Sequence, residues 1–439
     1  MIINSNTVGI IADDLTGAND TALQFKLNGA DTTILLNPNI ENESAKAQQT
    51  WAISTESRNI PQEDAFQIVK EATQFLVDNF NPDFFYKKID STIRGNIAVE
   101  VMSMLQVLEW DAAIIVPAFP QEGRITVGGY HLSKGVPIER TEMARDPHSP
   151  IYESHVPTLL KYQLGENLAD LVGSLELKTI MDGAGPILKE INKLIENGTK
   201  IIVADSVSTT DIEQIVLAMG KSEYKILPVG TAAAGKILSN EWFPPQEDHE
   251  ILPIHLPKLP KFIISGSATQ ITANQIEKFE QCDEYEENSL IIELDMNTIL
   301  AGVSEEIVDR VSSNLTNGNI VLVHTSNLLR NFNGFADSTG DTDLTKSGLA
   351  RAITDYLANL TKQVLAKKKA VLITLGGETS YKCCESINAN QLQLIDEVCP
   401  AIALSRKENS DQWIVTKSGN LGGNNTLIEI LNYFKKHEE

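Results

Sequence analysis

Short apolar runs alternate with amphipathic segments along the first half of the chain. The runs are rich in β-branched residues and are bounded by Gly, Asn, Asp or Pro, a pattern typical of buried strands. Between them, apolar residues recur at helical spacing, as in Val99, Met102 and Leu105. We expect strands at 8–12, 32–36, 50–54, 83–86, 112–116, 200–205 and 225–228. This alternation predicts an α/β fold with a mostly parallel sheet and helices on both faces.

A second α/β series begins after a proline-rich stretch. Pro253, Pro257 and Pro260 stand apart without a hydrophobic period, which favours a linker. We therefore expect an N-terminal domain over 1–242, a linker over 243–260 and a C-terminal α/β domain over 261–439. In the second domain, we expect strands at 261–265, 289–294, 319–325 and 370–375, and a last helix at 427–434.

The stretch 117–157 breaks the alternation, because it is rich in Gly, Pro, Arg and His. An insertion or lid that reaches over a site would have this composition, and so would an irregular surface excursion. The sequence leaves both interpretations open.

Composition supports two domains. A chain of 439 residues is longer than one ordinary core requires, and its 42% hydrophobic and 22% charged residues are typical of a soluble globular protein. No apolar run approaches the roughly 20 residues that span a bilayer, and the net charge of −23 disfavours nucleic acid or an anionic membrane as a partner. We expect a cytoplasmic protein, with a homodimer as the default assembly.

The cysteines form no recognisable ligand or disulfide pattern. Cys282, Cys383, Cys384 and Cys399 make no CxxC, and no histidine cluster has zinc-like spacing. We expect reduced, structural thiols.

The first strand runs into a loop with two adjacent carboxylates, Asp13 and Asp14, followed by Thr16 and Gly17 at the start of a helix. Open α/β proteins bind ligands at the carboxyl edge of the sheet, where free helix-end amides also complement an anion. Solvated surface carboxylates and ordinary turn chemistry are the alternative explanation.

A second loop of similar design follows the strand at 83–86. It supplies Lys88, Asp90, Ser91 and Arg94 within a few positions, and a capped helix with a local Asp90–Arg94 ion pair is the alternative. A small anionic ligand requires a local excess of cations in this acidic chain. The candidates for that excess are Arg58, Lys87, Lys88, Arg94 and Arg124.

The second half contains three loops suited to a nucleotide, because glycines let the backbone approach phosphate and helix-start amides complement its charge. The candidate residues are Ser267 in the first loop, Gly376, Gly377, Glu378 and Thr379 in the second, and Gly419, Gly422 and Gly423 in the third. Each loop alone is also explained by packing, whereas three in one domain favour binding.

Two other glycine motifs do not fit a nucleotide site. The segment 230–237 has P-loop spacing, but Ile237 replaces the Ser or Thr that holds magnesium, so strand-to-helix packing explains it better. Gly183 and Gly185 lack the third glycine of a dinucleotide fingerprint, since Leu188 stands there. The missing third glycine weakens the interpretation of the chain as a dinucleotide-dependent oxidoreductase.

Taken together, the motifs resemble those of the four-carbon acid sugar kinase family over essentially the whole chain. The matching pieces are IADDLTGAND at 11–20, KIDSTIRG at 88–95, PAFP at 117–120 with GGY at 128–130, GGET at 376–379 and KSGNLGG at 417–423. The family commonly has Gly or Phe where Asn420 and Leu421 stand, and often Ala at Ser380. These departures are mild.

The resemblance implies a kinase that uses ATP and Mg²⁺ to phosphorylate a four-carbon acid. The N-terminal domain would hold the acid through Asp13, Arg58, Lys88, Asp90, Ser91 and Arg94, with Asp14 and Lys88 as catalytic residues. The C-terminal domain would hold ATP through Ser267, 376–379 and 419–423. Arg58 or Arg94 suits the substrate carboxylate, while Asp13 and Asp90 suit its hydroxyls.

In this hypothesis, Asp14 or Asp13 accepts the proton of the terminal hydroxyl or orients that hydroxyl toward the γ-phosphate. The metal ligand is left open between Glu378 and an N-terminal aspartate. The version of the motif at 14–20 favours D-threonate or D-erythronate, with 3-oxo-tetronate as the alternative substrate. A hydroxy-acid oxidoreductase and a non-enzymatic ligand sensor are the competing classes.

Overall fold

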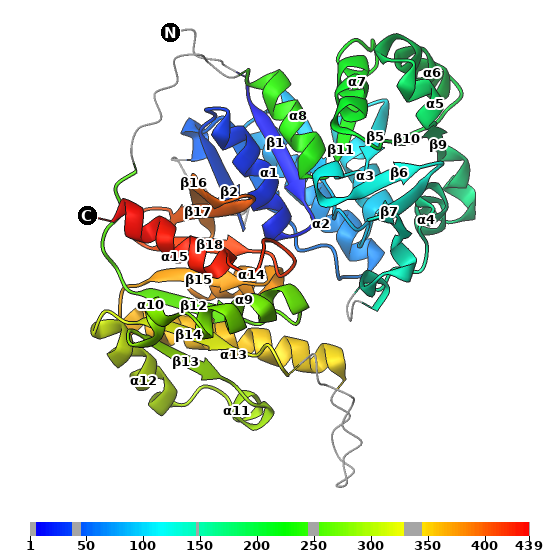
Figure 1. The fold of residues 1–439 in the computed structure, drawn as a ribbon. Helices are drawn as coiled ribbons and strands as arrows, with labels where there is room; N and C mark the ends of the chain where they lie inside the picture. The colour runs from blue at the N-terminus through cyan, green and yellow to red at the C-terminus, as the bar shows by residue number, and fades with distance from the viewer. Residues whose placement is uncertain (1–5, 37–44, 146–148, 245–253, 329–344, 439) are drawn as a thin grey trace. The chain divides into compact units, whose positions relative to one another are not determined.

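The computed structural model describes the chain except for residues 1–5, 37–44, 146–148, 245–253, 329–344 and 439. The chain divides into two compact units, Met1–Glu247 and Asp248–Glu439, which we call the N-terminal and C-terminal domains (Figure 1). Part of the linker predicted over 243–260 lies outside the described residues.

The N-terminal domain is built on a parallel sheet. Its strands have the spatial order β2-β3-β1-β4-β11-β5-β10-β9, and every neighbouring pair in this order is parallel. The order reverses around β1, which lies between β3 and β4. The strands are β1 (Val8–Ala12), β2 (Thr32–Leu35), β3 (Thr50–Ser54), β4 (Phe84–Lys88), β5 (Ala112–Val116), β9 (Val172–Leu175), β10 (Ile201–Ala204) and β11 (Ile226–Gly230).

Helices cover both faces of this sheet (Figure 1). Successive strand residues point to opposite faces, and the buried core that contains Phe85 also contains Leu76 of α2 and Val101 of α3. On the other face, Tyr86 donates to the carbonyl of Thr231 at the start of α8. The helices are α1 (Leu15–Leu27), α2 (Gln62–Asn79), α3 (Ile97–Leu108), α4 (Val156–Leu164), α5 (Leu177–Met181), α6 (Ala184–Glu196), α7 (Thr209–Met219) and α8 (Ala232–Trp242).

The stretch that interrupts the α/β alternation forms a small antiparallel sheet. Its strands are β6 (Arg124–Val127), β7 (Tyr130–Ser133) and β8 (Val136–Pro137). The carboxylate of Asp205, after β10, accepts from the backbone amides of Gly128 (2.8 Å) and Gly129 (2.9 Å) in the β6–β7 turn. Because that carboxylate is buried, it fixes the turn to the main sheet.

The C-terminal domain is a second α/β unit. Its strand order is β13-β14-β12-β15-β18-β17-β16, parallel from β13 to β18 and antiparallel from β18 to β16. The strands are β12 (Lys261–Ser265), β13 (Ser289–Glu293), β14 (Ile320–His324), β15 (Val371–Leu375), β16 (Gln391–Cys399), β17 (Ile402–Lys407) and β18 (Trp413–Lys417). The helices are α9 (Gln270–Glu280), α10 (Asp283–Glu286), α11 (Met296–Ala301), α12 (Glu305–Thr316), α13 (Lys346–Lys367), α14 (Gly377–Ser386) and α15 (Thr426–His437).

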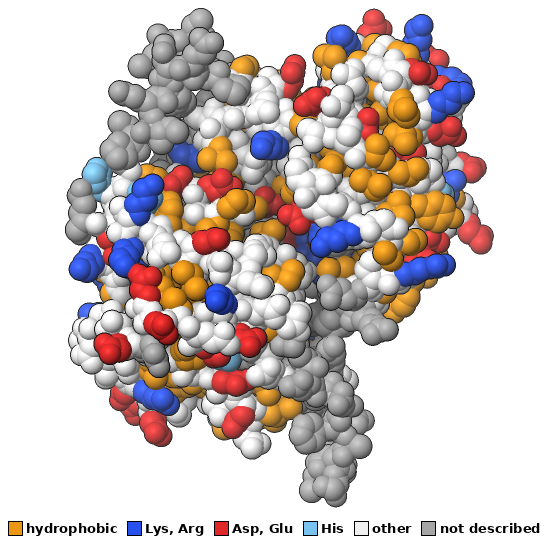
Figure 2. Space-filling model, viewed as in Figure 1, with side chains coloured by type: hydrophobic (Ala, Val, Ile, Leu, Met, Phe, Trp, Pro, Cys, Tyr) orange, Lys and Arg blue, Asp and Glu red, His pale blue; other side chains and the backbone are white. Residues whose placement is uncertain are grey.

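The predicted fold class is confirmed. Four predicted strands agree with the structure at both ends, namely those at 8–12, 50–54, 112–116 and 261–265. Those at 32–36, 200–205, 289–294, 319–325 and 370–375 agree to within one residue at each end. All four cysteines are free thiols. None of the helices in the described parts of the chain is both long and apolar enough to cross a membrane. On the face drawn in Figure 2, acidic side chains are distributed over both domains among Lys and Arg.

Candidate functional site

The predicted N-terminal site residues follow neighbouring strands of one sheet. Asp13 and Asp14 follow β1, Arg58 lies in the loop after β3, and Asp90 lies in the loop after β4. The order β3-β1-β4 therefore places these loops side by side at the carboxyl edge, where the strand order reverses. This is the position at which open α/β sheets bind their ligands.

Arg58 joins these loops through its guanidinium group. Its Nε and Nη2 donate to the two carboxylate oxygens of Asp13 at 2.7 and 3.0 Å, and its Nη1 donates to Asp14 Oδ2 at 2.8 Å. Nη2 also lies 3.8 Å from Asp90 Oδ1. Burial alone lowers the pKa of Arg58, but the three aspartates outweigh it and raise the pKa well above its usual value.

Asp14 is the N-cap of α1. Its side chain accepts from the amide of Gly17 at 2.8 Å and from the Thr16 hydroxyl at 2.8 Å. Burial alone raises the pKa of Asp14, yet Arg58 and Lys88 outweigh burial and lower it. Asp14 is therefore an ionised acceptor with a fixed direction, held at a helix N-terminus that also favours negative charge.

Lys88 approaches the start of the same helix. A methyl group built on Gly17 would lie 2.7 Å from Asp14 Oδ1 and 3.0 Å from Lys88 Nζ, so only glycine leaves room for both groups. Nζ donates to the carbonyl of Ile89 at 2.9 Å. One helix start thus brings together the two predicted catalytic residues, Asp14 and Lys88.

The loop after β4 is organised by Asp90. Arg94 donates to both carboxylate oxygens of Asp90, at 2.8 Å from Nε and 2.9 Å from Nη2, and the Thr92 hydroxyl donates to the same carboxylate. Burial raises the pKa of Asp90, but Arg94, Arg58 and Thr92 outweigh it and hold that pKa well below its usual value. Ile93 has a φ of 59°, an uncommon conformation for a β-branched residue, and such strain is concentrated at functional sites.

Beneath this site lies a buried ion pair. Lys87 Nζ is 2.7 Å from Glu100 Oε2, and the two side chains are 0% and 1% exposed. The sequence makes Lys87 a candidate for a local excess of positive charge, but Glu100 of α3 pairs with it inside the domain.

Glu56 is the residue that sequence reasoning overlooked. It has a φ of 47°, and its Oε1 accepts from the amide of Leu15 at 2.8 Å and from the Ser54 hydroxyl at 2.6 Å. Burial and the negative charge of Asp14 raise the pKa of Glu56 to about 8. In the sequence, Arg58 is a candidate site residue, but an ordinary surface turn over 56–58 is the alternative, and only the fold shows that Glu56 faces the start of α1.

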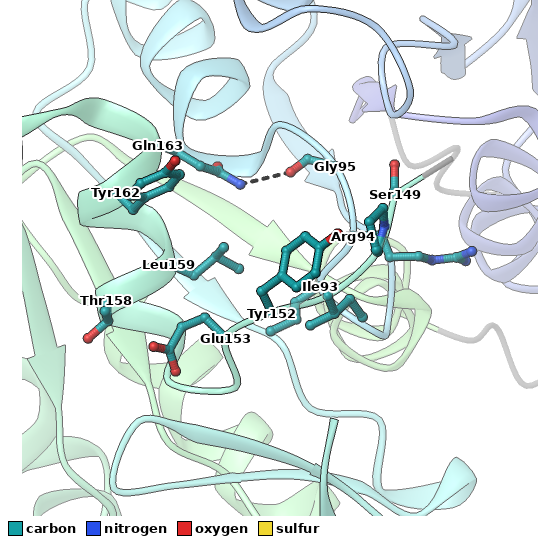
Figure 3. A pocket seen from close by; sticks show the side chains of 12 residues that line it. Ile93, Arg94, Gly95, Ser149, Tyr152, Glu153, Thr158, Leu159, Tyr162 and Gln163 are labelled. Carbon is teal, nitrogen blue, oxygen red and sulfur yellow. Dashed lines mark hydrogen bonds between the residues drawn. The ribbon is translucent and has the colours of Figure 1, made fainter. Parts of the chain in front are cut away.

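A cavity of about 440 Å³ adjoins the Asp90 loop (Figure 3). Leu159 and Tyr152 line it, and Gln163 at its rim donates to the carbonyl of Gly95 at 2.8 Å. The guanidinium of Arg94 points away from these side chains (Figure 3). The cavity thus offers mainly apolar walls, whereas the charged groups lie on the aspartate side of the loop. Its lining residues are Ile93, Arg94, Gly95, Ser149, Pro150, Ile151, Tyr152, Glu153, Thr158, Leu159, Tyr162 and Gln163.

In the C-terminal domain, the three predicted nucleotide loops follow the adjacent strands β12, β15 and β18. A methyl group on Gly419 would lie 2.5 Å from Ser267 Oγ, and one on Gly266 would lie 2.5 Å from Thr379 Oγ1. Gly376 has a φ of 117°, which side chains rarely tolerate. The loops therefore pack against one another so closely that larger residues do not fit.

Helix α9 holds the last glycine-rich loop in place. The hydroxyls of Thr269 and Thr272 donate to the carbonyl of Gly419 at 2.6 and 2.9 Å. Gln275 Nε2 donates to the carbonyls of Leu421 (3.0 Å) and Gly423 (2.9 Å). These bonds occupy loop carbonyls, which repel phosphate, and fix the backbone conformation of the loop.

Lys417 and Glu378 supply charge at these loops. Lys417 is buried, its Nζ donates to the carbonyl of Ser418 at 2.8 Å, and burial lowers its pKa to about 7. Glu378 is exposed in the first turn of α14. Across the described ranges, no group of three or more His, Cys, Asp or Glu side chains is arranged to hold a metal ion.

The P-loop-like segment has a packing role. A methyl group on Gly230 would lie 2.8 Å from the carbonyl of Val116, and one on Gly235 would lie 2.9 Å from Thr21 of α1. These glycines allow α8 to approach the sheet and α1, as the sequence indicates.

Comparison with known proteins fits this division. Residues 8–238 match the family described as a sugar-binding N-terminal domain, and residues 262–427 match a nucleotide-binding C-terminal domain. A sugar-binding domain followed by a nucleotide-binding domain, together with the kinase relatives described below, makes this chain an ATP-dependent phosphotransferase. The chain belongs to the four-carbon acid sugar kinase family.

Several relatives are similar over nearly their whole length. A D-erythronate kinase of Heliobacterium modesticaldum is 28% identical, with 98% of this chain and 97% of the relative covered. A D-threonate kinase of Salmonella typhimurium is 26% identical, with 97% and 98% covered. A 3-oxo-tetronate kinase of Haemophilus influenzae is 24% identical, with 94% and 97% covered.

The fold is also similar to a solved structure. A crystal structure of a Haemophilus influenzae protein matches with a TM-score of 0.73 and 22% identity, covering 97% of this chain and 100% of that one. This likeness supports the fold assignment.

Proposed function

We propose that this protein phosphorylates the terminal hydroxyl of D-threonate or D-erythronate with ATP and releases the 4-phosphate and ADP. The observation that carries the proposal is the Asp13–Arg58–Asp14 cluster at the carboxyl edge of a sheet in the sugar-binding domain. The relatives named D-erythronate kinase and D-threonate kinase, at 28% and 26% identity, support these two acids. The alternative is a 3-oxo-tetronate 4-kinase, the name of another relative.

In the N-terminal domain, Asp14 accepts the hydrogen bond of the terminal hydroxyl and orients its oxygen for attack. Its lowered pKa keeps it ionised at working pH, and phosphoryl transfer depends mainly on positioning and charge stabilisation. Arg58 holds Asp13 and Asp14 in one arrangement, so that the acceptor geometry exists before substrate arrives. Lys88, near the start of α1, offsets negative charge on the transferred group.

In the C-terminal domain, the loops at 376–379 and 419–423 hold the nucleotide phosphates. The absence of side chains at Gly376 and Gly419 lets backbone amides approach phosphate oxygens, and Ser267 lies between these loops. Helix α14 begins at Gly377, within the first of these loops, so that loop carries first-turn amides that have no partner inside the helix.

Mg²⁺ accompanies the nucleotide. This ion keeps several waters and needs only one or two carboxylates besides substrate phosphates, so a cluster of three protein ligands is not required. Glu378, exposed in the first turn of α14, is the carboxylate that fits this limited role. The ion would neutralise charge on the phosphate oxygens. The predicted cytoplasmic location and homodimer stay predictions.

An ADP-release screen of the full chain tests the proposal. The panel contains D- and L-threonate, D- and L-erythronate and the 3-oxo acids, each with and without Mg²⁺. We expect ADP release with D-threonate or D-erythronate, and a product that carries phosphate on the terminal oxygen by NMR. Turnover restricted to the 3-oxo acids supports the alternative kinase. Acid-dependent reduction of a nicotinamide, or a thermal shift without ADP release, would instead support the oxidoreductase or the ligand sensor.

A further inference from the structure

Arg124 differs from the other arginines around the aspartate cluster. Arg58 is paired with Asp13 and Asp14, Arg94 is paired with Asp90, and Lys87 is paired with Glu100. Within the part of the chain that the structure describes, Arg124 makes no ion pair with a carboxylate. Its Nη1 donates to the Ser91 hydroxyl oxygen at 2.9 Å, and its Nε is buried without a hydrogen-bond partner.

The bond between Arg124 and Ser91 leaves a donor available at Ser91. A guanidinium can only donate hydrogen bonds, so Ser91 Oγ is the acceptor in this contact. The hydroxyl proton of Ser91 is therefore directed to another acceptor. A guanidinium and a hydroxyl that each retain an unused N–H or O–H donor can together bind the two oxygens of a carboxylate.

The antiparallel sheet at 124–137 holds this pair in position. His131 Nε2 lies 3.0 Å from the Ser91 carbonyl, which can only accept, so Nε2 carries the proton and Nδ1 accepts from the Thr126 hydroxyl at 3.1 Å. Burial lowers the pKa of His131 to about 4, which keeps the ring neutral, and the charge of Arg124 acts in the same direction. Ser91 is thus fixed by its backbone through His131 and by its side chain through Arg124.

Two cations around the aspartate cluster make no ion pair with a carboxylate among the described residues, namely Lys88 and Arg124. Lys88 lies beside Asp14 at the start of α1, where its Nζ donates to the carbonyl of Ile89 at 2.9 Å. Arg124 contacts Ser91 instead, in the loop after β4. Lys88 is therefore placed toward the proposed acceptor Asp14, and Arg124 is the arginine left for a substrate carboxylate.

We propose that Arg124 and Ser91 bind the carboxylate of the four-carbon acid and thereby determine the preference for sugar acids over neutral sugars. The inference rests on the proposed function and changes the expectation that Arg58 or Arg94 fills this role, because those guanidinium groups already hold aspartates. Asp90, beside Ser91 in the loop, connects this end of the site to Arg58.

Kinetics of the full chain with Arg124→Gln test the inference, with the acid turned over by the wild type as one substrate and erythritol as its neutral analogue. The KM for the acid is expected to rise roughly 10- to 100-fold, the loss typical of a charged hydrogen bond. The KM for ATP and the kcat/KM for erythritol are expected to stay unchanged, so the preference for the acid over erythritol falls. Arg140→Gln, which removes an exposed arginine from the same insertion, is the matched control and is expected to behave as wild type.

Two further variants keep the test decisive if Arg124→Gln does not fold. Arg124→Lys retains the positive charge but loses the planar guanidinium with its several N–H donors. Ser91→Ala removes only the hydroxyl. Both variants are expected to raise the KM for the acid. An unchanged KM for the acid in the folded variants, or a rise confined to the KM for ATP, overturns the inference. A wild-type protein that phosphorylates no four-carbon acid refutes the proposed function instead.

Discussion

Arg58 holds both carboxylate oxygens of Asp13, with Nε 2.7 Å from Oδ2 and Nη2 3.0 Å from Oδ1. The two residues are far apart in the sequence and follow the neighbouring strands β3 and β1. A planar guanidinium can make this paired contact and still reach Asp14 with its third nitrogen, whereas an ammonium cannot. The site therefore depends on arginine chemistry as well as on positive charge.

Replacing Arg58 by Ala should destabilise the protein by about 3–5 kcal/mol, because Asp13 and Asp14 would be left as buried, unpaired charges. Arg58→Lys should keep part of this stability but lose the arrangement of the two carboxylates, and its kcat should fall at least tenfold. Urea unfolding and ADP release measure the two effects. A lysine variant with wild-type kcat would show that the paired contact is not needed for turnover.

Asp14→Asn should lower kcat by roughly 10²–10⁴-fold, the range typical of an orienting acid–base group. An asparagine oxygen still caps a helix, so the loss of stability should stay below that of Arg58→Ala. Asp295→Asn removes the charge of another N-cap aspartate, which accepts from Thr298 at 2.7 Å in the C-terminal domain. This control should leave kcat unchanged, whereas near-normal turnover in both Asp14→Asn and Asp13→Asn would exclude an aspartate acceptor.

Glu56 should make the stability of the fold depend on pH. Burial raises its pKa from 4.5 to about 8, so between these values the folded chain retains a proton that the unfolded chain has lost. The free energy of unfolding should therefore fall as pH rises through this window, by up to roughly 5 kcal/mol in total. Glu56→Gln keeps an acceptor for Leu15 and Ser54 and lacks this titration, so its Tm should exceed that of the wild type increasingly toward pH 8.5. Parallel Tm curves for the two proteins between pH 5 and 8.5 would contradict the assignment.

The sequence predicts the elements well where local pattern determines them. The strands at 8–12 and 50–54 are apolar runs with clear bounds, and the structure confirms both. The sequence does not predict strands β16 to β18, which pair in an antiparallel arrangement. Polar residues such as Gln393 and Asp396 interrupt the apolar pattern of β16, so it does not stand out as a buried strand. Strand β9 contains Gly173 and is short, so it gives a weak pattern.

The candidate site was predictable in its parts but not in its pairings. Local motifs identified Asp13, Asp14 and Asp90, and the rule for parallel sheets indicated that their loops meet at one edge. Neither the raised pKa of Glu56 nor the contact between Arg124 and Ser91 can be predicted from the neighbouring residues in the sequence. Both depend on which loops the strand order and the inserted sheet bring together.

Gly419→Ala should weaken nucleotide binding at least tenfold. A methyl group there would lie 2.5 Å from Ser267 Oγ and would force apart the loops after β12 and β18. Titration of ATP by calorimetry measures the effect, and binding of the sugar acid should stay unchanged. Gly185→Ala, at a helical position with no atom within 4 Å, is the matched control. If Gly419→Ala binds ATP as the wild type does, the third loop does not approach the phosphates.

The buried pair of Lys87 and Glu100 should contribute to specificity of the fold more than to its stability. Removing one partner leaves the other charge in the core, so Lys87→Met should destabilise the protein by about 3–5 kcal/mol. The double variant Lys87→Met with Glu100→Leu removes both charges and should recover most of that loss, because burial of the pair itself carries a desolvation penalty. Lys369→Met breaks the exposed pair with Asp411, whose side chains are 74% and 81% exposed, and should change stability by less than about 1 kcal/mol. Urea unfolding measures the stability of the three variants. A double variant no more stable than Lys87→Met would mean that the folded domain requires the ion pair itself. Glu100 also lies close enough to Asp13 for the charge of Asp13 to raise its pKa, which would connect the pair to the site.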